Sequence, residues 1–175
     1  MATLTAILEQ LLARIDLCEA DAAALMRALT DESLPPAMAA ALLVALRSKG
    51  ETAAEVRGFA TAMRALARRF ELPPGLPAAD IVGTGGDSSG SLNLSTGSAL
   101  VAAACGLPIV KHGNRSVSSK SGSADVLEAL GLTLPADPAA ARAQLDATNF
   151  TFLFAPNFHP AMKAIAPVRR ALGVR

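Results

Sequence analysis

The N-terminal part of the chain repeats apolar positions at helical spacing. Apolar side chains recur every three or four residues in four segments, roughly residues 4–15, 22–29, 38–46 and 56–70. This spacing gives each helix one apolar stripe. Pro35-Pro36 is typical of a helix start, and Thr52 with Glu55 has the spacing of a capping box for the fourth helix. Because short helices need partners to cover such stripes, we predict a helical bundle domain over residues 1–72.

A proline-rich stretch, Pro73 to Pro77, ends this pattern, and we place a domain boundary there because proline interrupts helices and strands. Beyond it the pattern predicts strands at about 79–82, 107–110 and 150–154, alternating with helices at about 94–105, 123–130 and 137–147. Asp137-Pro138 is an N-cap followed by proline at the first helical position. The alternation predicts an α/β domain over residues 78–156 with a mostly parallel sheet. Residues 157–175 favour short helices separated by Pro167.

The unusual chemistry follows the first two predicted strands. The glycine-rich segment Gly83–Asp87 lets backbone amides approach a ligand, and Asn93–Thr96 places hydroxyls at a helix N-terminus, which favours anions. The segment Lys111–Ser119 adds basic and hydroxyl side chains after the second strand. Loops at the carboxyl ends of parallel strands converge, so we predict one crevice that binds a phosphate ester. The glycine spacing matches neither the mononucleotide phosphate loop nor the dinucleotide fingerprint.

Charge and composition exclude several other classes of function. The formal net charge is only +1, which argues against a nucleic-acid partner or a membrane surface, because both usually require a broad basic face. The longest uncharged apolar stretches are too short to span a bilayer, and no secretory signal is visible at the N-terminus. Cys18 and Cys105 lie far apart in helical patterns, which fits reduced thiols in the cytoplasm.

Four motifs in order resemble the signatures of the anthranilate phosphoribosyltransferase family. They are Gly83–Asp87 (GTGGD), Asn93–Thr96 (NLST), Lys111–Ser119 (KHGNRSVSS) and Gly122–Asp125 (GSAD). The helical part is also similar to the family, so the resemblance covers essentially the whole chain. It implies a nucleoside phosphorylase/phosphoribosyltransferase-like fold, an α/β domain with a separate all-α N-terminal domain and an incomplete sheet. It also implies that the 157–175 helices pack back on the helical domain, through which the family forms homodimers.

The resemblance implies transfer of phosphoribose from phosphoribosyl pyrophosphate to the amine of anthranilate, with release of pyrophosphate and with Mg²⁺ as cofactor. Positioning and electrostatic stabilisation would carry such a reaction, so no catalytic nucleophile is expected. The implied donor-binding residues are Gly83, Gly86, Asp87, Ser91, Asn93, Leu94, Ser95, Thr96, Lys111, His112, Gly113, Asn114, Arg115, Ser118, Ser119 and Ser123. The implied anthranilate-binding residues are Gly83, His112, Asn114 and Arg169, and Ser95 is the implied metal contact.

The family's chains are roughly twice as long, so this sequence is similar to an N-terminal half. The family's adjacent Asp–Glu pair, its principal acidic Mg²⁺ ligands, belongs to the other half, and Asp31-Glu32 in the helical part is not its equivalent. We therefore expect this chain alone to be nearly inactive.

Two other functions stay open from the sequence. A pyrimidine nucleoside phosphorylase shares the fold, although Lys111–Arg115 and Arg169 argue against it. A non-catalytic dimerisation module is the alternative from another class, in which the loops would have lost their role.

Overall fold

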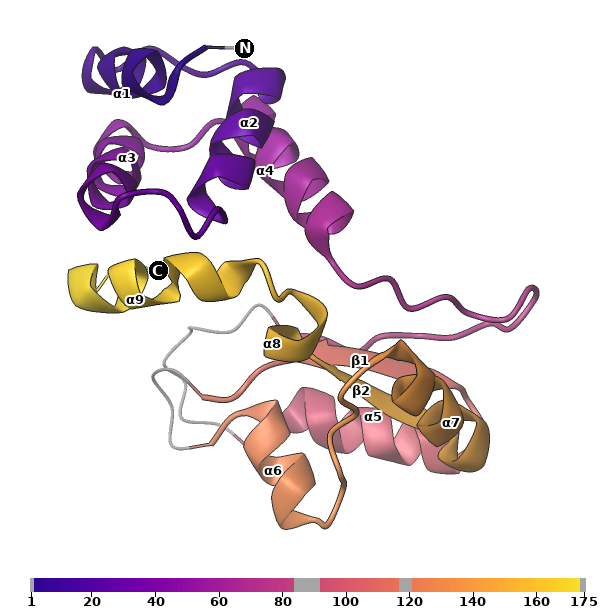
Figure 1. Ribbon diagram of the computed structural model, residues 1–175. Helices are drawn as coiled ribbons and strands as arrows, with labels where there is room; N and C mark the ends of the chain where they lie inside the picture. Colours follow the sequence, from indigo (N-terminus) through magenta and orange to yellow (C-terminus); the bar gives the residue numbers. More distant parts are fainter. Residues whose placement is uncertain (1, 84–91, 117–120, 174–175) are drawn as a thin grey trace. The chain divides into compact units, whose positions relative to one another are not determined.

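The computed structural model describes residues 2–83, 92–116 and 121–173 and divides the chain into two compact units. One unit comprises Met1–Ala67 together with His159–Arg175, and the other comprises Arg68–Phe158. The predicted class is confirmed: an all-helical N-terminal part and an α/β part with a small parallel sheet (Figure 1). No helix among the described residues is long and apolar enough to cross a membrane.

The first unit is a bundle of amphipathic helices. Its helices are α1 (Leu4–Leu12), α2 (Glu19–Leu29), α3 (Pro36–Lys49), α4 (Ala53–Leu66) and α9 (Met162–Leu172). Their apolar stripes meet in one core, which includes Ile7, Leu25, Leu42 and, from the far end of the chain, Ile165. Helix α9 thus packs with α3 in the same unit, although more than a hundred residues separate them in sequence.

Helices α2 and α4 approach each other closely because α4 carries a glycine at the crossing. A Cβ atom placed on Gly58 would lie 2.3 Å from the backbone oxygen of Glu19 and 2.8 Å from the Cβ atom of Ala22. Real Cβ atoms do not come this close, so glycine permits this crossing and a larger residue would force the helices apart.

The predicted capping box at the start of α4 is confirmed, and its glutamate does more than cap. Thr52 Oγ1 accepts a hydrogen bond from Glu55 N, and Glu55 Oε2 accepts from Thr52 N at 2.7 Å. Glu55 is fully buried, and its Oε1 also accepts from Leu17 N, in the turn before α2, at 2.9 Å. Lys49, at the end of α3, donates to Glu55 Oε2 at 2.9 Å. This one carboxylate therefore joins three elements of the bundle.

The second unit contains a two-stranded parallel sheet and its helices. The elements are α5 (Leu94–Ala104), β1 (Ile109–Gly113), α6 (Ser123–Ala129), α7 (Pro138–Thr148), β2 (Phe150–Phe154) and α8 (Ala155–Phe158). Lys111 pairs with Phe152 in the register of β1 with β2. Ile109 and Phe152, both fully buried, lie in a core to which α5 and α6 contribute Ala99 and Leu127.

Two strand predictions need correction. Residues 79–82 do not form a strand: only Ala79 pairs, in a single parallel bridge to Ile109. The chain leaves the sheet at Asp80, whose carboxylate accepts a hydrogen bond from the N–H of His112 at 3.4 Å. The second strand begins at Ile109 and ends at Gly113, later than predicted, because its pairing with β2 continues to Phe154.

Candidate functional site

The candidate site lies where the described chain leaves β1 and the Ala79 bridge. Lys111, His112 and Gly113 were predicted in a loop, but the structure places them in the last three positions of β1. Because a strand fixes the direction of alternate side chains, this placement buries Lys111 and leaves it only 2% exposed. The first cation of the predicted basic loop is therefore a buried residue of a strand.

Among the described residues, Lys111 has one hydrogen-bond acceptor for its charge. Its ammonium group donates to the backbone oxygen of Ile81, in the segment that follows the Ala79 bridge. Burial lowers the pKa of Lys111, and the negative charge of Asp80 opposes this shift only in part. Within the described ranges, no carboxylate forms an ion pair with Lys111. An ammonium group has three donors, so the site has capacity for further acceptors.

The start of α5 lies next to the segment that carries Ile81. A Cβ atom built on Gly83 would lie 3.4 Å from Ser95 Oγ, which places the end of this segment against the first turn of α5. Asn93 stands at the N-cap position of this helix, but its side chain makes no cap hydrogen bond. Its Nδ2 instead donates to the backbone oxygen of Ser121 at 3.4 Å, which links the start of α5 to the approach to α6.

The remaining described residues of the Asn93–Thr96 motif have different surroundings. Leu94 is exposed, whereas Thr96 is buried against the core at 2% exposure. Thr96 N donates to the backbone oxygen of Asn93 at 3.0 Å, as in an ordinary first turn. Ser95 is therefore the hydroxyl of this motif that lies beside Gly83.

The chain after β1 is held closely to the start of α6. A Cβ atom on Gly113 would lie 2.5 Å from Ser123 Oγ and 2.8 Å from the ring of Phe152, so this position requires glycine. Ser123 Oγ donates to the backbone oxygen of Asn114 at 3.1 Å, and Ala124 N donates to the same oxygen at 3.3 Å. Residues from two of the recognised motifs, Asn114 and Ser123, are thus in direct contact.

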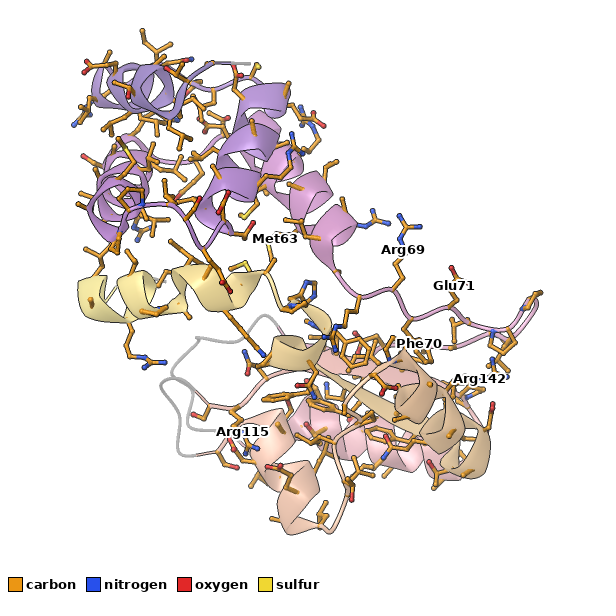
Figure 2. The ribbon with its side chains drawn as sticks, in the orientation of Figure 1. Met63, Arg69, Phe70, Glu71, Arg115 and Arg142 are labelled. Atoms are coloured by element: carbon orange, nitrogen blue, oxygen red, sulfur yellow. The ribbon has the colours of Figure 1, made fainter. Side chains whose placement is uncertain are left out.

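Arg115 does not lie free in the site. Its guanidinium donates through Nη1 to Asp125 Oδ1 at 3.1 Å and through Nη2 to Glu128 Oε1 at 2.8 Å, and it lies 5.5 Å from the ring centroid of Phe154. Figure 2 shows Arg115 beside α6. The hydrogen bonds that Arg115 donates to Glu128 and Asp125 raise the pKa of Arg115, whose side chain is about half exposed. Its predicted contact with the donor stays a prediction.

Sequence reasoning missed the carboxylates that hold Arg115. Asp125 stood in the recognised GSAD motif without an assigned role, and Glu128 was not considered. Their spacing of three residues on a predicted helix places them on one face, and this was the available signal. Which cation they meet depends on tertiary structure, so the spacing alone could not name Arg115.

Several predicted site residues are not placed by the structure. Gly86, Asp87, Ser91, Ser118 and Ser119 lie outside the described residues. Arg169 belongs to α9 in the other unit, so its predicted role toward anthranilate stays a prediction. His112 is half-buried on β1, and its backbone N–H donates to Asp80.

The described residues do not by themselves make a Mg²⁺ site. Magnesium prefers carboxylate and phosphate oxygens in an octahedral arrangement. No cluster of three or more acidic, histidine or cysteine side chains occurs in the described part of the chain, and Ser95 offers one neutral hydroxyl. Any Mg²⁺ here would need most of its ligands from outside the described residues.

Comparison with known proteins agrees with this arrangement. Residues 75–175 match the α/β domain of the glycosyl transferase family, and residues 5–67 match the helical bundle domain of the same family. A curated anthranilate phosphoribosyltransferase from Burkholderia mallei is 54% identical over 86% of this chain and 44% of its own length.

Solved structures of anthranilate phosphoribosyltransferases are also similar to this chain. The crystal structure of anthranilate phosphoribosyltransferase from Thermus thermophilus has a TM-score of 0.84 and 48% identity, and the match covers 97% of this chain and 51% of that one. The Saccharomyces cerevisiae enzyme in complex with PRPP and Mg has a TM-score of 0.85 and 29% identity over 98% of this chain and 52% of that one. This chain therefore spans about half the length of the relatives it matches. The resemblance seen in the four sequence motifs is confirmed, and the chain belongs to the glycosyl transferase family.

Proposed function

We propose that this chain carries the donor-binding half of an anthranilate phosphoribosyltransferase. The reaction would transfer phosphoribose from phosphoribosyl pyrophosphate to the amine of anthranilate and release pyrophosphate. The four sequence motifs and the similarity to whole enzymes of this activity support the proposal. The relatives are about twice as long, so we propose the complete activity for this chain together with a polypeptide that corresponds to their remaining half.

Lys111 is the observation that carries the proposal. A buried ammonium group that has one backbone acceptor among the described residues, and a lowered pKa, is costly to the folded state. A phosphate oxygen from the donor would supply the missing negative charge and favour the protonated form of Lys111. We therefore propose that the pyrophosphate of the donor binds near the carboxyl end of β1.

Neutral groups that follow Ile81 in the chain also support a polyanionic ligand. Gly83 and Ser95 lie side by side, and the first turn of α5 presents the positive end of a helix dipole. We propose that Gly83, Asn93 and Ser95 contact the donor together with Lys111. The other predicted donor residues in the described chain, apart from Arg115, are proposed on the motif alone: Leu94, Thr96, His112, Gly113, Asn114 and Ser123.

The acceptor and the metal are proposed from the family resemblance. We propose that His112, Asn114, Gly83 and Arg169 contact anthranilate. A solved relative contains PRPP and Mg, which supports Mg²⁺ as a companion of the donor, and Ser95 Oγ is the contact that this chain is proposed to supply. We also propose a cytoplasmic homodimer that forms through the helical domain.

Titration calorimetry with phosphoribosyl pyrophosphate tests the donor site directly. The parent chain should bind the donor in the presence of Mg²⁺, and Lys111→Met should weaken binding by about 10–100-fold, which corresponds to the loss of a charge-assisted contact. Lys163→Met is the matched control, because Lys163 is an exposed lysine on α9 and its loss should leave binding unchanged. Equal binding by the parent and Lys111→Met would refute the site.

Turnover distinguishes this function from the related ones. Phosphoribosyl-anthranilate should form when the chain is mixed with the polypeptide that matches the relatives' remaining half, and very little should form with this chain alone. Phosphorolysis of thymidine or uridine by the same mixture, without phosphoribosyl-anthranilate formation, would favour a pyrimidine nucleoside phosphorylase instead.

A further inference from the structure

A cluster around Arg115 joins the chain after β1 to helix α6. It consists of Arg115, Asp125, Glu128 and Phe154, and we call it the Arg115 cluster. Asp125 Oδ2 accepts hydrogen bonds from Ser116 N at 3.0 Å and from Gly122 N at 2.7 Å. One carboxylate thus receives two backbone N–H groups that are six positions apart in the chain, in addition to the Arg115 guanidinium.

The backbone at this point is unusually close. A Cβ atom on Gly122 would lie 2.2 Å from Ser116 N and 2.5 Å from the carbonyl carbon of Arg115. The Asp125 carboxylate accepts hydrogen bonds from both of the backbone N–H groups that come together here. The hydrogen bonds from Ser116 and Gly122 hold the pKa of Asp125 below its ordinary value. The same start of α6 holds Asn114 through Ser123 Oγ.

The charge of the Arg115 cluster argues against Arg115 as a phosphate ligand. One guanidinium faces two carboxylates, so the cluster is net negative and would repel a pyrophosphate. The Phe154 ring lies 5.5 Å from the guanidinium carbon, within the range of a cation–π contact. The cation of Arg115 thus has two carboxylate partners, whereas Lys111 has none within the described residues.

We infer that Asp125 and Glu128 are positioning residues, which hold Arg115 and the backbone at Ser116 and Gly122 in place beside the donor site. Arg115 belongs to the same support and acts through these backbone contacts rather than on a phosphate. Exposed ion pairs contribute little to global stability, so the effect of the cluster should be local. This inference rests on the proposed function only in its expected effect on donor binding.

Amide hydrogen exchange tests the support without any ligand. Asp125→Asn keeps the size of the side chain and removes its charge, and it should speed exchange at Ser116 and Gly122 by about tenfold or more while the core of β1 stays protected. Asp146→Asn is the matched control, because it removes the Arg142–Asp146 ion pair on α7 of the same unit and should leave both amides unchanged. Unchanged exchange at Ser116 and Gly122 in Asp125→Asn would overturn the inference.

A double-mutant cycle then separates support from direct contact. If Arg115 acts through Glu128, then Arg115→Gln and Glu128→Gln should each weaken the binding of phosphoribosyl pyrophosphate. The double variant should then bind as well as the single variant that has the lower affinity. If Arg115 touches the phosphate, Glu128→Gln releases the cation and leaves binding equal or tighter, and that result would overturn the inference. Absence of donor binding by the parent would overturn the proposed function, and the exchange experiment would then decide the inference alone.

Discussion

Among the described residues, Lys49 in the helical unit and Lys111 in the α/β unit are both buried, and the two lysines have opposite environments. Lys49 in the helical unit donates to Asp16 Oδ1 at 2.8 Å, to the backbone oxygen of Gly50 at 2.7 Å and to Glu55 Oε2 at 2.9 Å. Lys111 in the α/β unit donates to one recorded acceptor among the described residues, the backbone oxygen of Ile81. Both side chains are almost fully buried, so burial alone does not distinguish them.

The pKa directions follow from this difference. Burial opposes the charge of Lys49, but the hydrogen bonds and charges of Asp16 and Glu55 outweigh it and raise the pKa of Lys49. At Lys111 burial prevails over Asp80, and the pKa is lowered. Removal of a buried cation whose donors are all paired is costly, because its carboxylate partners stay behind without a counter-charge, whereas a buried cation with spare donors is held at a cost and fits a ligand-binding role.

Replacement of each lysine by methionine is the strongest test of this comparison. Lys49→Met should lower the free energy of unfolding by about 3–5 kcal/mol, because the fully buried Glu55 loses its cation. Lys111→Met should change it by less than about 1 kcal/mol, since the removed desolvation penalty offsets the hydrogen bond lost at Ile81. Urea denaturation followed by circular dichroism measures both. A larger loss for Lys111→Met than for Lys49→Met would reverse the assignment of structural and functional lysine.

Glycine-to-alanine changes compare how tightly the two units are packed. Gly58→Ala in α4 should destabilise the protein by about 1–3 kcal/mol, because its Cβ atom would meet the backbone of α2 at 2.3 Å. Gly97→Ala in α5 meets nothing within 4 Å and should stabilise by up to about 1 kcal/mol through helix propensity. Scanning calorimetry should therefore show melting temperatures that move in opposite directions. A rise for Gly58→Ala would show that the α2–α4 crossing is loosely packed.

Local sequence patterns predicted the features that depend on neighbours along the chain. The capping box of Thr52 and Glu55 is present, and Asp137 caps α7 by accepting from Ala140 N at 2.9 Å. These contacts join residues three positions apart, so spacing alone suffices to identify them.

Features that depend on distant partners were not predictable in the same way. The contact of Glu55 with Leu17 spans 38 residues, and the burial of Lys111 follows from its pairing with Phe152. Residues 79–82 have the composition of a strand, but Asp80 turns its carboxylate to His112 and ends the pairing after Ala79. The motif identified Lys111 as a candidate, and only the fold shows that its charge lacks a carboxylate partner in the described chain.

The pH dependence of stability should also have opposite signs for the two lysines. The folded pKa of Lys111 lies below its ordinary value of 10.5, so between these two values the unfolded chain binds more protons and stability rises with pH. The folded pKa of Lys49 lies above 10.5, so its contribution is complete below that pH and is lost as the pH rises through the folded pKa.

Each lysine's contribution is the difference in the free energy of unfolding between the parent and the methionine variant, measured by urea denaturation along an alkaline pH series. The difference for Lys111 should rise toward pH 10.5 by at most about 1.4 kcal/mol per pH unit, the limit for one proton. The difference for Lys49 should stay level over the same range and fall above it. If the two differences changed with pH in the same direction, the two ammonium groups would have similar environments. The distinction between a lysine with all its donors paired and one with spare donors would then fail.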